Sequence, residues 1–202
     1  MDFTSQWALA GGLALGSGFR LYATVLLVGM LQRFGGLELP AGLSVLSHDW
    51  VLWTSAVLTV AEFVADKVPA FDSLWDALQA LIRIPAGALL AHGALSQADP
   101  TMQWMALLVG GGIAGTTQAG KASTRLAINH SPEPFSNWLA SFSEDGLWAL
   151  MMWLMVAHPL IFGVALTISV MLSAALAWAL WRFLRAGLRR LQQWRAPVAA
   201  TP

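Results

Sequence analysis

The sequence predicts an all-α polytopic membrane protein with about six transmembrane helices. Of its 202 residues, 57% are hydrophobic and only 11% are charged, and apolar runs close to 20 residues long recur along the chain. One of these runs, Leu160–Trp181, has 22 residues and no charge, so it is long enough to cross a bilayer as a helix. We therefore expect one transmembrane domain over residues 1–181, followed by a basic amphipathic tail over residues 182–202.

The composition excludes several classes of site. The chain contains no cysteine, which excludes a disulfide framework and a thiolate metal site. Its formal net charge is zero, so no overall field attracts nucleic acid, and no nucleic-acid partner is expected. The four histidines lack the spacing of a zinc site. We expect no cofactor, and no catalytic residue can be assigned.

The first three predicted spans contain a break and a hairpin. The first span, Trp7–Leu31, includes the segment Gly16–Arg20, whose two glycines allow a helix to break or kink within the membrane. The second span, Trp50–Asp66, and the third, Asp72–Leu95, are separated by a turn that contains Pro69. These two spans are expected to form a helical hairpin.

A second predicted hairpin follows. Its spans are Met102–Ile128 and Trp138–Ala157, and the turn between them, Asn129–Asn137, again contains proline. The tetrapeptide DSLW at residues 72–75 returns as DGLW at residues 145–148. Such short matches are compatible with a 3+3 inverted repeat, an arrangement found in many transporters.

The basic residues predict the orientation in the membrane. Because five of the 11 Lys and Arg residues follow the last span, the positive-inside rule places the C-terminus in the cytoplasm. Six spans then place the N-terminus there as well, together with both hairpin turns. In the tail, arginines alternate with Leu and Trp, which is typical of a helix on anionic lipid. The five basic residues are Arg182, Arg185, Arg189, Arg190 and Arg195.

Charged residues within the spans form stripes on single helix faces. Glu62 and Asp66 are four residues apart on one helix, and Asp76 and Arg83 are seven apart on the next. A charge at a helix centre costs about 2.5–3.5 kcal/mol in the membrane, so these side chains should face the protein interior or one another. The candidate solute- or ion-binding residues are Arg20, Glu62, Asp66, Asp72, Asp76, Arg83, Lys121, Arg125, Glu144 and Asp145.

The balance of these charges bears on the ligand. With Lys67 and Glu133 added, the central set has seven acids and five cations. An excess of two negative charges favours a bound cation or protonated carboxylates. Two alternatives stay open. Lys67, Asp72 and Glu133 lie near predicted helix ends, where snorkelling or capping explains them. The deeper charges could also be ion pairs that only hold helices together.

Four segments of the chain resemble a known family. They are GFRLYATVLLVG at 18–29, AEFVADKVPAFDSLWDALQALIRIPAGALLA at 61–91, KASTRLAINHSPEPFSNW at 121–138 and SEDG at 143–146. They are similar to the bacterial membrane family of domain of unknown function 4126, over about residues 5–165, with the last span and the tail peripheral to it. The resemblance implies a bacterial membrane protein distinguished by its charged hairpins, and it carries no activity over to this chain.

These observations lead to one functional hypothesis and two alternatives. The hypothesis is a small transporter or ion-permeation protein of the bacterial inner membrane, with a polar site between the two hairpins and the broken first span. Its partners would be a small solute or ion and anionic lipid at the tail, and a homo-oligomer is compatible with the sequence. The alternatives are an intramembrane enzyme acting on a lipid headgroup and a non-catalytic assembly subunit.

Overall fold

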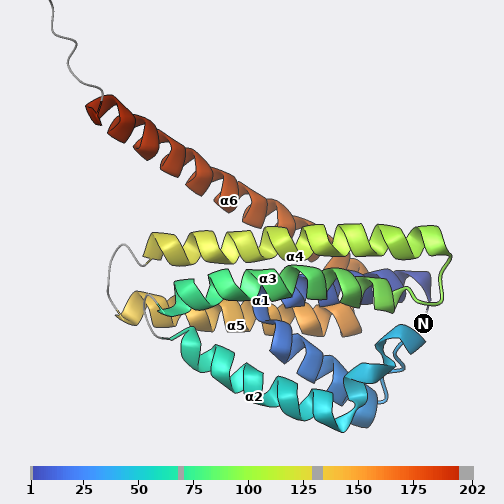
Figure 1. Cartoon of the computed structure of the whole chain (residues 1–202). Coiled ribbons are helices and arrows are strands. Elements are labelled where there is room, and N and C mark those ends of the chain that lie inside the picture. Colours follow the sequence, from blue (N-terminus) through green and yellow to red (C-terminus); the bar gives the residue numbers. More distant parts are fainter. Residues whose placement is uncertain (1, 68–70, 129–133, 196–202) are drawn as a thin grey trace, which may run out of the picture.

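The structure is a computed structural model that describes residues 2–67, 71–128 and 134–195. In these ranges the chain is all-α. It forms six long helices and one short 3-10 helix, which was not predicted and lies between the first two long ones (Figure 1). The helices are α1 (Phe3–Phe34), η1 (Ala41–Ser47), α2 (Asp49–Ala65), α3 (Phe71–Ala94), α4 (Pro100–Ile128), α5 (Pro134–Ala157) and α6 (Pro159–Arg195).

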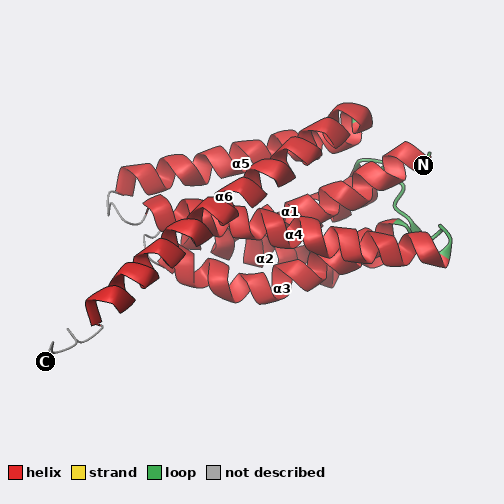
Figure 2. Cartoon of the chain, turned by 90° about the horizontal axis from the view of Figure 1, so that it is seen from above, coloured by secondary structure: helices red, strands yellow, loops and turns green. Residues whose placement is uncertain are grey.

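Helix α1 lies at the centre of the bundle and packs against every other helix (Figure 2). Its long run of small and apolar residues explains this position, because the run forms most of the buried core together with residues of α3, α5 and α6. The other long helices expose many large apolar side chains on their outer faces, such as Leu81, Leu108 and Met171. The molecule is therefore charged inside and apolar outside, as expected in lipid.

The predicted break in the first span is confirmed, and it reverses the chain. Arg20 has non-helical dihedral angles, φ −149° and ψ 81°. A Cβ atom on Gly16 would lie 2.5 Å from Thr24 Oγ1, although residues eight apart in a straight helix are separated by about 12 Å along the axis. Helix α1 is thus a V whose two arms return to the same end of the bundle, with Arg20 at the tip (Figure 1).

The reversal changes the expected path of the chain. Trp7 lies near the start of α1 and Gly42 lies shortly after its end, and both are close to the C-terminal end of α3. The two ends of α1 are therefore at the same end of the bundle. Helices α2 to α6 then run alternately along its length, and the start of α1 and the end of α6 lie at opposite ends of the bundle (Figures 1 and 2). The structure therefore does not show six crossings. The segment Gly16–Arg20, where the sequence predicted a break or a kink, reverses the direction of helix α1.

The expected pairing of spans into hairpins is also looser than predicted. Helices α2 and α3 contact each other only slightly, as do α4 and α5, because the arms of α1 pack between them; α3 packs mainly against α4. The Pro69 turn and most of the Asn129–Asn137 turn lie outside the described residues. In a 3+3 repeat α4 would correspond to α1, but α4 runs unbroken over 29 residues. The structure therefore gives no support to an inverted repeat.

Three helical segments in the described ranges are long and apolar enough to cross a membrane: Phe3–Phe34, Leu74–Ala94 and Pro159–Ala186. The expected spans within α2, α4 and α5 fall short by this measure, since α2 has only 17 residues and all three carry charges or polar runs. The tail predicted from residue 182 continues α6 as far as Arg195 and leaves the bundle (Figure 1).

Close packing at the tip of α1 depends on Gly18, which leads to a first prediction. A Cβ atom on Gly18 would lie 2.7 Å from the backbone oxygen of Ala114 in α4, whereas one on Gly112, on the same helix as Ala114, would meet nothing within 4 Å. Gly18→Ala should therefore lower the free energy of unfolding by about 1–3 kcal/mol. Gly112→Ala should leave stability unchanged or raise it by about 0.5–1 kcal/mol. Thermal unfolding of both variants in detergent checks this, and equal melting would contradict the close approach.

Candidate functional site

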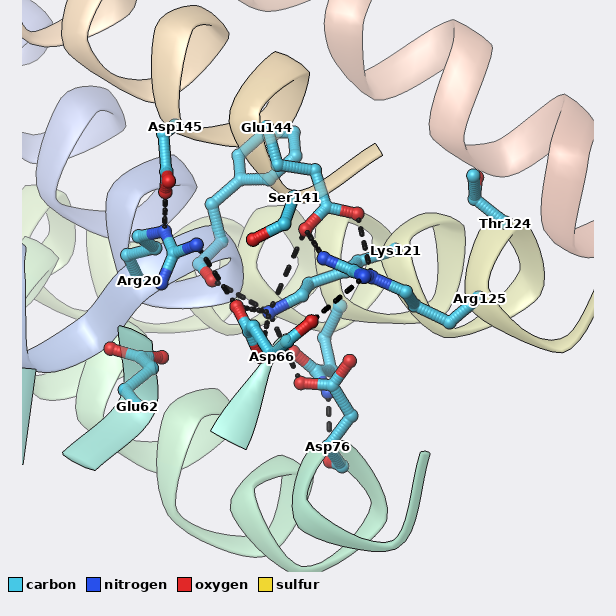
Figure 3. Close-up of polar contacts among 12 residues, drawn as sticks. Arg20, Glu62, Asp66, Asp76, Lys121, Thr124, Arg125, Ser141, Glu144 and Asp145 are labelled. Atoms are coloured by element: carbon cyan, nitrogen blue, oxygen red, sulfur yellow. Dashed lines mark hydrogen bonds and ion pairs between the residues drawn. The ribbon is translucent and has the colours of Figure 1, made fainter. Parts of the chain in front are cut away.

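The centre of the site is the ammonium group of Lys121, buried in the middle of the bundle. Its Nζ atom lies 3.1 Å from Asp66 Oδ2, 3.2 Å from Asp76 Oδ1 and 3.9 Å from Glu144 Oε2. The carboxylates come from α2, α3 and α5 and point toward Lys121 of α4 (Figure 3). A fourth oxygen, the Phe19 carbonyl at the tip of α1, lies 3.5 Å away. We call Lys121 and these three carboxylates the Lys121 cage.

Each carboxylate of the Lys121 cage also has an arginine of its own. Arg20 lies 3.0 Å from Asp66, and Arg83 lies 2.9 Å from Asp76. Arg125 donates two hydrogen bonds to Glu144, at 3.1 Å from Nε to Oε1 and at 2.7 Å from Nη2 to Oε2. Bidentate pairs of this kind are geometrically specific and stronger than neutral hydrogen bonds. The lysine is thus surrounded by three arginine–carboxylate pairs.

Two further acids complete what we call the charge network. Glu62 pairs with Arg83, and Asp145 pairs with Arg20 (Figure 3 shows the second pair). The network then contains five acids and four cations, which leaves one negative charge in excess. Its members are Arg20, Glu62, Asp66, Asp76, Arg83, Lys121, Arg125, Glu144 and Asp145.

Local helix geometry explains how the sequence assembles this network. Lys121 and Arg125 are one helical turn apart on α4, so both reach Glu144 on the facing helix α5. Asp66 caps the C-terminal end of α2, where its side chain is free to turn into the bundle. Gly120 allows α6 to approach, since a Cβ atom there would lie 2.7 Å from Ser173 Cβ.

Neutral polar side chains support the network, and sequence reasoning missed several of them. Ser17 donates to the Arg83 backbone oxygen at 2.8 Å, and Tyr22 donates to Gln79 at 3.0 Å. Trp148 donates to Thr24 Oγ1 at 2.9 Å. Three of these, Ser17, Tyr22 and Thr24, lie within four residues of Arg20. A polar group so near a break in an apolar helix is the signal that could have identified them.

Gln118, three residues before Lys121 on α4, joins α3 to α4. Its Oε1 atom accepts a hydrogen bond from Arg83 at 2.7 Å, while its Nε2 atom donates to the Asp76 backbone oxygen at 2.8 Å. One amide therefore satisfies a buried guanidinium and a buried carbonyl together, which fixes the position of Asp76 next to Lys121.

Two carboxylates of the network have an oxygen without a hydrogen-bond donor among the described residues. They are Glu62 Oε2 and Asp76 Oδ2, and both side chains are almost fully buried. A buried carboxylate oxygen with no donor is costly as an anion. It is also the atom on which a proton or a cation gains most, so these two oxygens mark where the excess charge of the network can be neutralised.

The remaining predicted residues stand apart from the network. Lys67 places its ammonium 3.0 Å from the centre of the Phe63 ring and 4.8 Å from that of Phe142, and donates to Ser141 Oγ at 3.4 Å. Asp72 lies in the first turn of α3, but its side chain is outside what the structure describes, and Glu133 lies outside the described residues entirely. The described residues therefore do not test the predicted excess of two acids, which included Asp72 and Glu133.

The site has an opening toward the outside of the bundle. A groove of about 500 Å³ lies between α4, α5 and α6. Its wall is mostly apolar, and Lys121, Thr124, Ser143 and Glu144 line its polar part. No group of three or more His, Asp or Glu side chains in the described part of the chain is arranged to hold a metal ion.

Comparison with known proteins shows a family match that covers every residue of the charge network. A family model described as domain of unknown function (DUF4126) matches residues 7–182. The match includes nearly all of the apolar part of α6, which the four sequence segments had left peripheral. Neither the curated proteins nor the solved structures contain a match to the chain.

Proposed function

We propose that this chain, which belongs to the family of domain of unknown function 4126, is a small membrane transport or ion-permeation protein of the bacterial inner membrane. The observation that carries the proposal is the cluster of eight charged side chains around the buried Lys121, beside the tip of the reversed helix α1. Ion and substrate sites of membrane transporters are commonly built beside broken helices in this way.

The cost of burial supports a functional role for the network. Seven of the nine charged residues of the network are buried, and at about 2.5–3.5 kcal/mol for each charge at a helix centre this is a large cost for a bundle that apolar residues could hold together. Two features go beyond what helix pairing requires. One is the pair of carboxylate oxygens, on Glu62 and Asp76, that have no donor in the part of the chain that the structure describes. The other is the groove between α4, α5 and α6, whose lining includes Lys121 and Glu144.

The two alternative functions receive less support from the geometry. An enzyme acting on a lipid headgroup needs a nucleophile or a metal, and in the described residues each acid of the network is engaged by a cation. An assembly subunit would use charges on an outer face to bind its partner. Here the charges are interior, and the outer faces are apolar.

Reconstituted protein provides the experiment. Purified protein in liposomes should carry an ion or a small solute across the membrane, as read by a pH-sensitive dye, by ion-selective dyes for sodium and potassium, and by radiolabelled solutes. Flux above that of empty liposomes is the expected result. If no species moves under any imposed gradient while the protein is folded and oriented, transport is excluded.

The reversal of α1 leads to a proposed topology and a second prediction. We propose that α2 to α6 cross the membrane and that α1 enters and returns on one side. The positive-inside rule still places the tail in the cytoplasm, next to anionic lipid, so the N-terminus should be on the other side. Phosphatase and fluorescent-protein fusions at the two ends should therefore report opposite sides. Both termini in the cytoplasm, as six crossings require, would contradict the reversal.

A further inference from the structure

We propose that the Lys121 cage is a binding site for a monovalent cation of the ammonium class, and that the ammonium group of Lys121 occupies the place of that ion. The inference deepens the proposed transport function by naming the class of its cargo, and its role in transport rests on that function. Binding itself is testable without any flux, so the two can fail separately.

The oxygens around the Lys121 ammonium form the shell that a free cation would need. Four oxygens of Asp66, Asp76 and Glu144 lie 3.1–3.9 Å from Nζ. The chain delivers them from three helices, while the lysine comes from a fourth. The shell should persist if the lysine side chain moved away, because Arg20, Arg83 and Arg125 would still hold the three carboxylates.

The broken helix supplies an independent sign that the position suits a cation. The Phe19 carbonyl, 3.5 Å from Nζ, is at the C-terminal end of the first arm of α1, directly before the non-helical Arg20. The C-terminal end of a helix carries a partial negative charge, and exposed carbonyls of broken helices coordinate cations in membrane transporters. A backbone carbonyl and a helix end thus face the same point as the carboxylates.

The network also has spare capacity for a positive charge. It holds five acids and four cations, and the buried Asp76 Oδ2 atom of the cage has no hydrogen-bond donor in the described residues. Without Lys121 the excess would rise to two negative charges. A monovalent ion entering as Lys121 leaves would restore the present balance, so exchange of the two changes no net charge inside the protein.

Distances favour an ammonium-sized ion over a divalent metal. Calcium and magnesium bind oxygens at about 2.0–2.6 Å, clearly shorter than the 3.1–3.9 Å spacing of the cage. Ammonium, methylammonium and the similarly sized potassium ion fit the wider shell. The groove between α4, α5 and α6 lies beside the cage, since its lining includes Lys121 and Glu144.

The test removes the tethered ammonium and offers a free one. Purified Lys121→Ala should melt at a higher temperature in ammonium, methylammonium or potassium chloride than in tetramethylammonium chloride of the same ionic strength. At a concentration about ten times the dissociation constant, the expected rise is about 3–6 °C. Wild-type protein should melt equally in all four salts, because its own lysine fills the cage.

Two further variants control the experiment. Lys121→Met fills the space with an uncharged side chain, so it should show no difference among the salts. If Lys121→Ala alone does not fold, the double variant Lys121→Ala/Glu62→Gln restores the excess of one negative charge, and it keeps all three cage carboxylates because Glu62 pairs with Arg83. The double variant should show the same selective rise in melting temperature.

The outcomes separate the site from the transport function. A rise with the three small cations in the alanine variants alone supports the cage. Equal melting in all salts, or an equal rise in Lys121→Met, overturns it. A selective rise without ion flux in wild-type liposomes keeps the site and removes its role in transport. Flux of another species without any selective rise keeps transport and removes this site.

Discussion

Replacing Arg83 with methionine should destabilise the protein by about 3–5 kcal/mol, because it leaves two buried carboxylates without their guanidinium. Arg83 is fully buried and pairs with Glu62 on α2 and Asp76 on its own helix α3. Glu62 has no other ion-pair partner within the described network, so its charge would remain unpaired in a dry environment. Thermal unfolding in detergent measures the loss.

An exposed pair of the same type gives the matched control. Arg33 pairs with Asp49 at the surface, where their side chains are 41% and 73% exposed. Arg33→Met should cost at most about 1 kcal/mol, since water and salt screen such pairs. Adding Glu62→Gln to Arg83→Met should recover part of the lost stability, because it removes the orphaned charge. If Arg83→Met melts like Arg33→Met, the buried pairs are not what holds α2 to α3.

Replacing Lys121 with methionine should reduce flux through the protein by about tenfold or more, because the three cage carboxylates lose their shared cation. The measurement is initial flux in proteoliposomes of the species that wild-type protein carries. Arg125→Lys is the comparison variant. It retains the charge next to Glu144 but loses the two-point contact, so a smaller decrease is expected. Flux of Lys121→Met equal to wild type would remove the lysine from the pathway.

Much of the charge network could be predicted from the sequence, because charged side chains in a largely apolar chain are expected to face the protein interior and one another rather than lipid. The four-residue spacing of Glu62 and Asp66 and the stripe of Asp76 and Arg83 predicted that these side chains face the interior, and all four are buried. The individual partners could not be predicted. Glu62 pairs with Arg83 rather than with Lys121, because partner choice depends on helix rotation and on depth in the bundle.

The reversal of α1 could not be predicted from the sequence, and the reason is physical. Glycines at residues 16 and 18 predict a break, but the angle between the two arms depends on what packs around them. Here Gly16 lets Thr24 fold back against it, and Gly18 lets α4 approach the tip. These contacts join residues that are not neighbours in sequence, so no local sequence pattern reveals them. The same reversal moves the N-terminus to the opposite end of the bundle (Figure 1).

The most direct test of a functional charge network is flux through a variant whose charges are balanced but whose lysine is gone. Lys121→Met/Asp76→Asn removes one cation and one acid, so the network keeps its excess of one negative charge and should melt close to wild type. We predict that this double variant, reconstituted in liposomes at wild-type density, carries almost no flux. Wild-type flux through a stable double variant would show that the ion pairs only hold the helices together, and would contradict the proposed function.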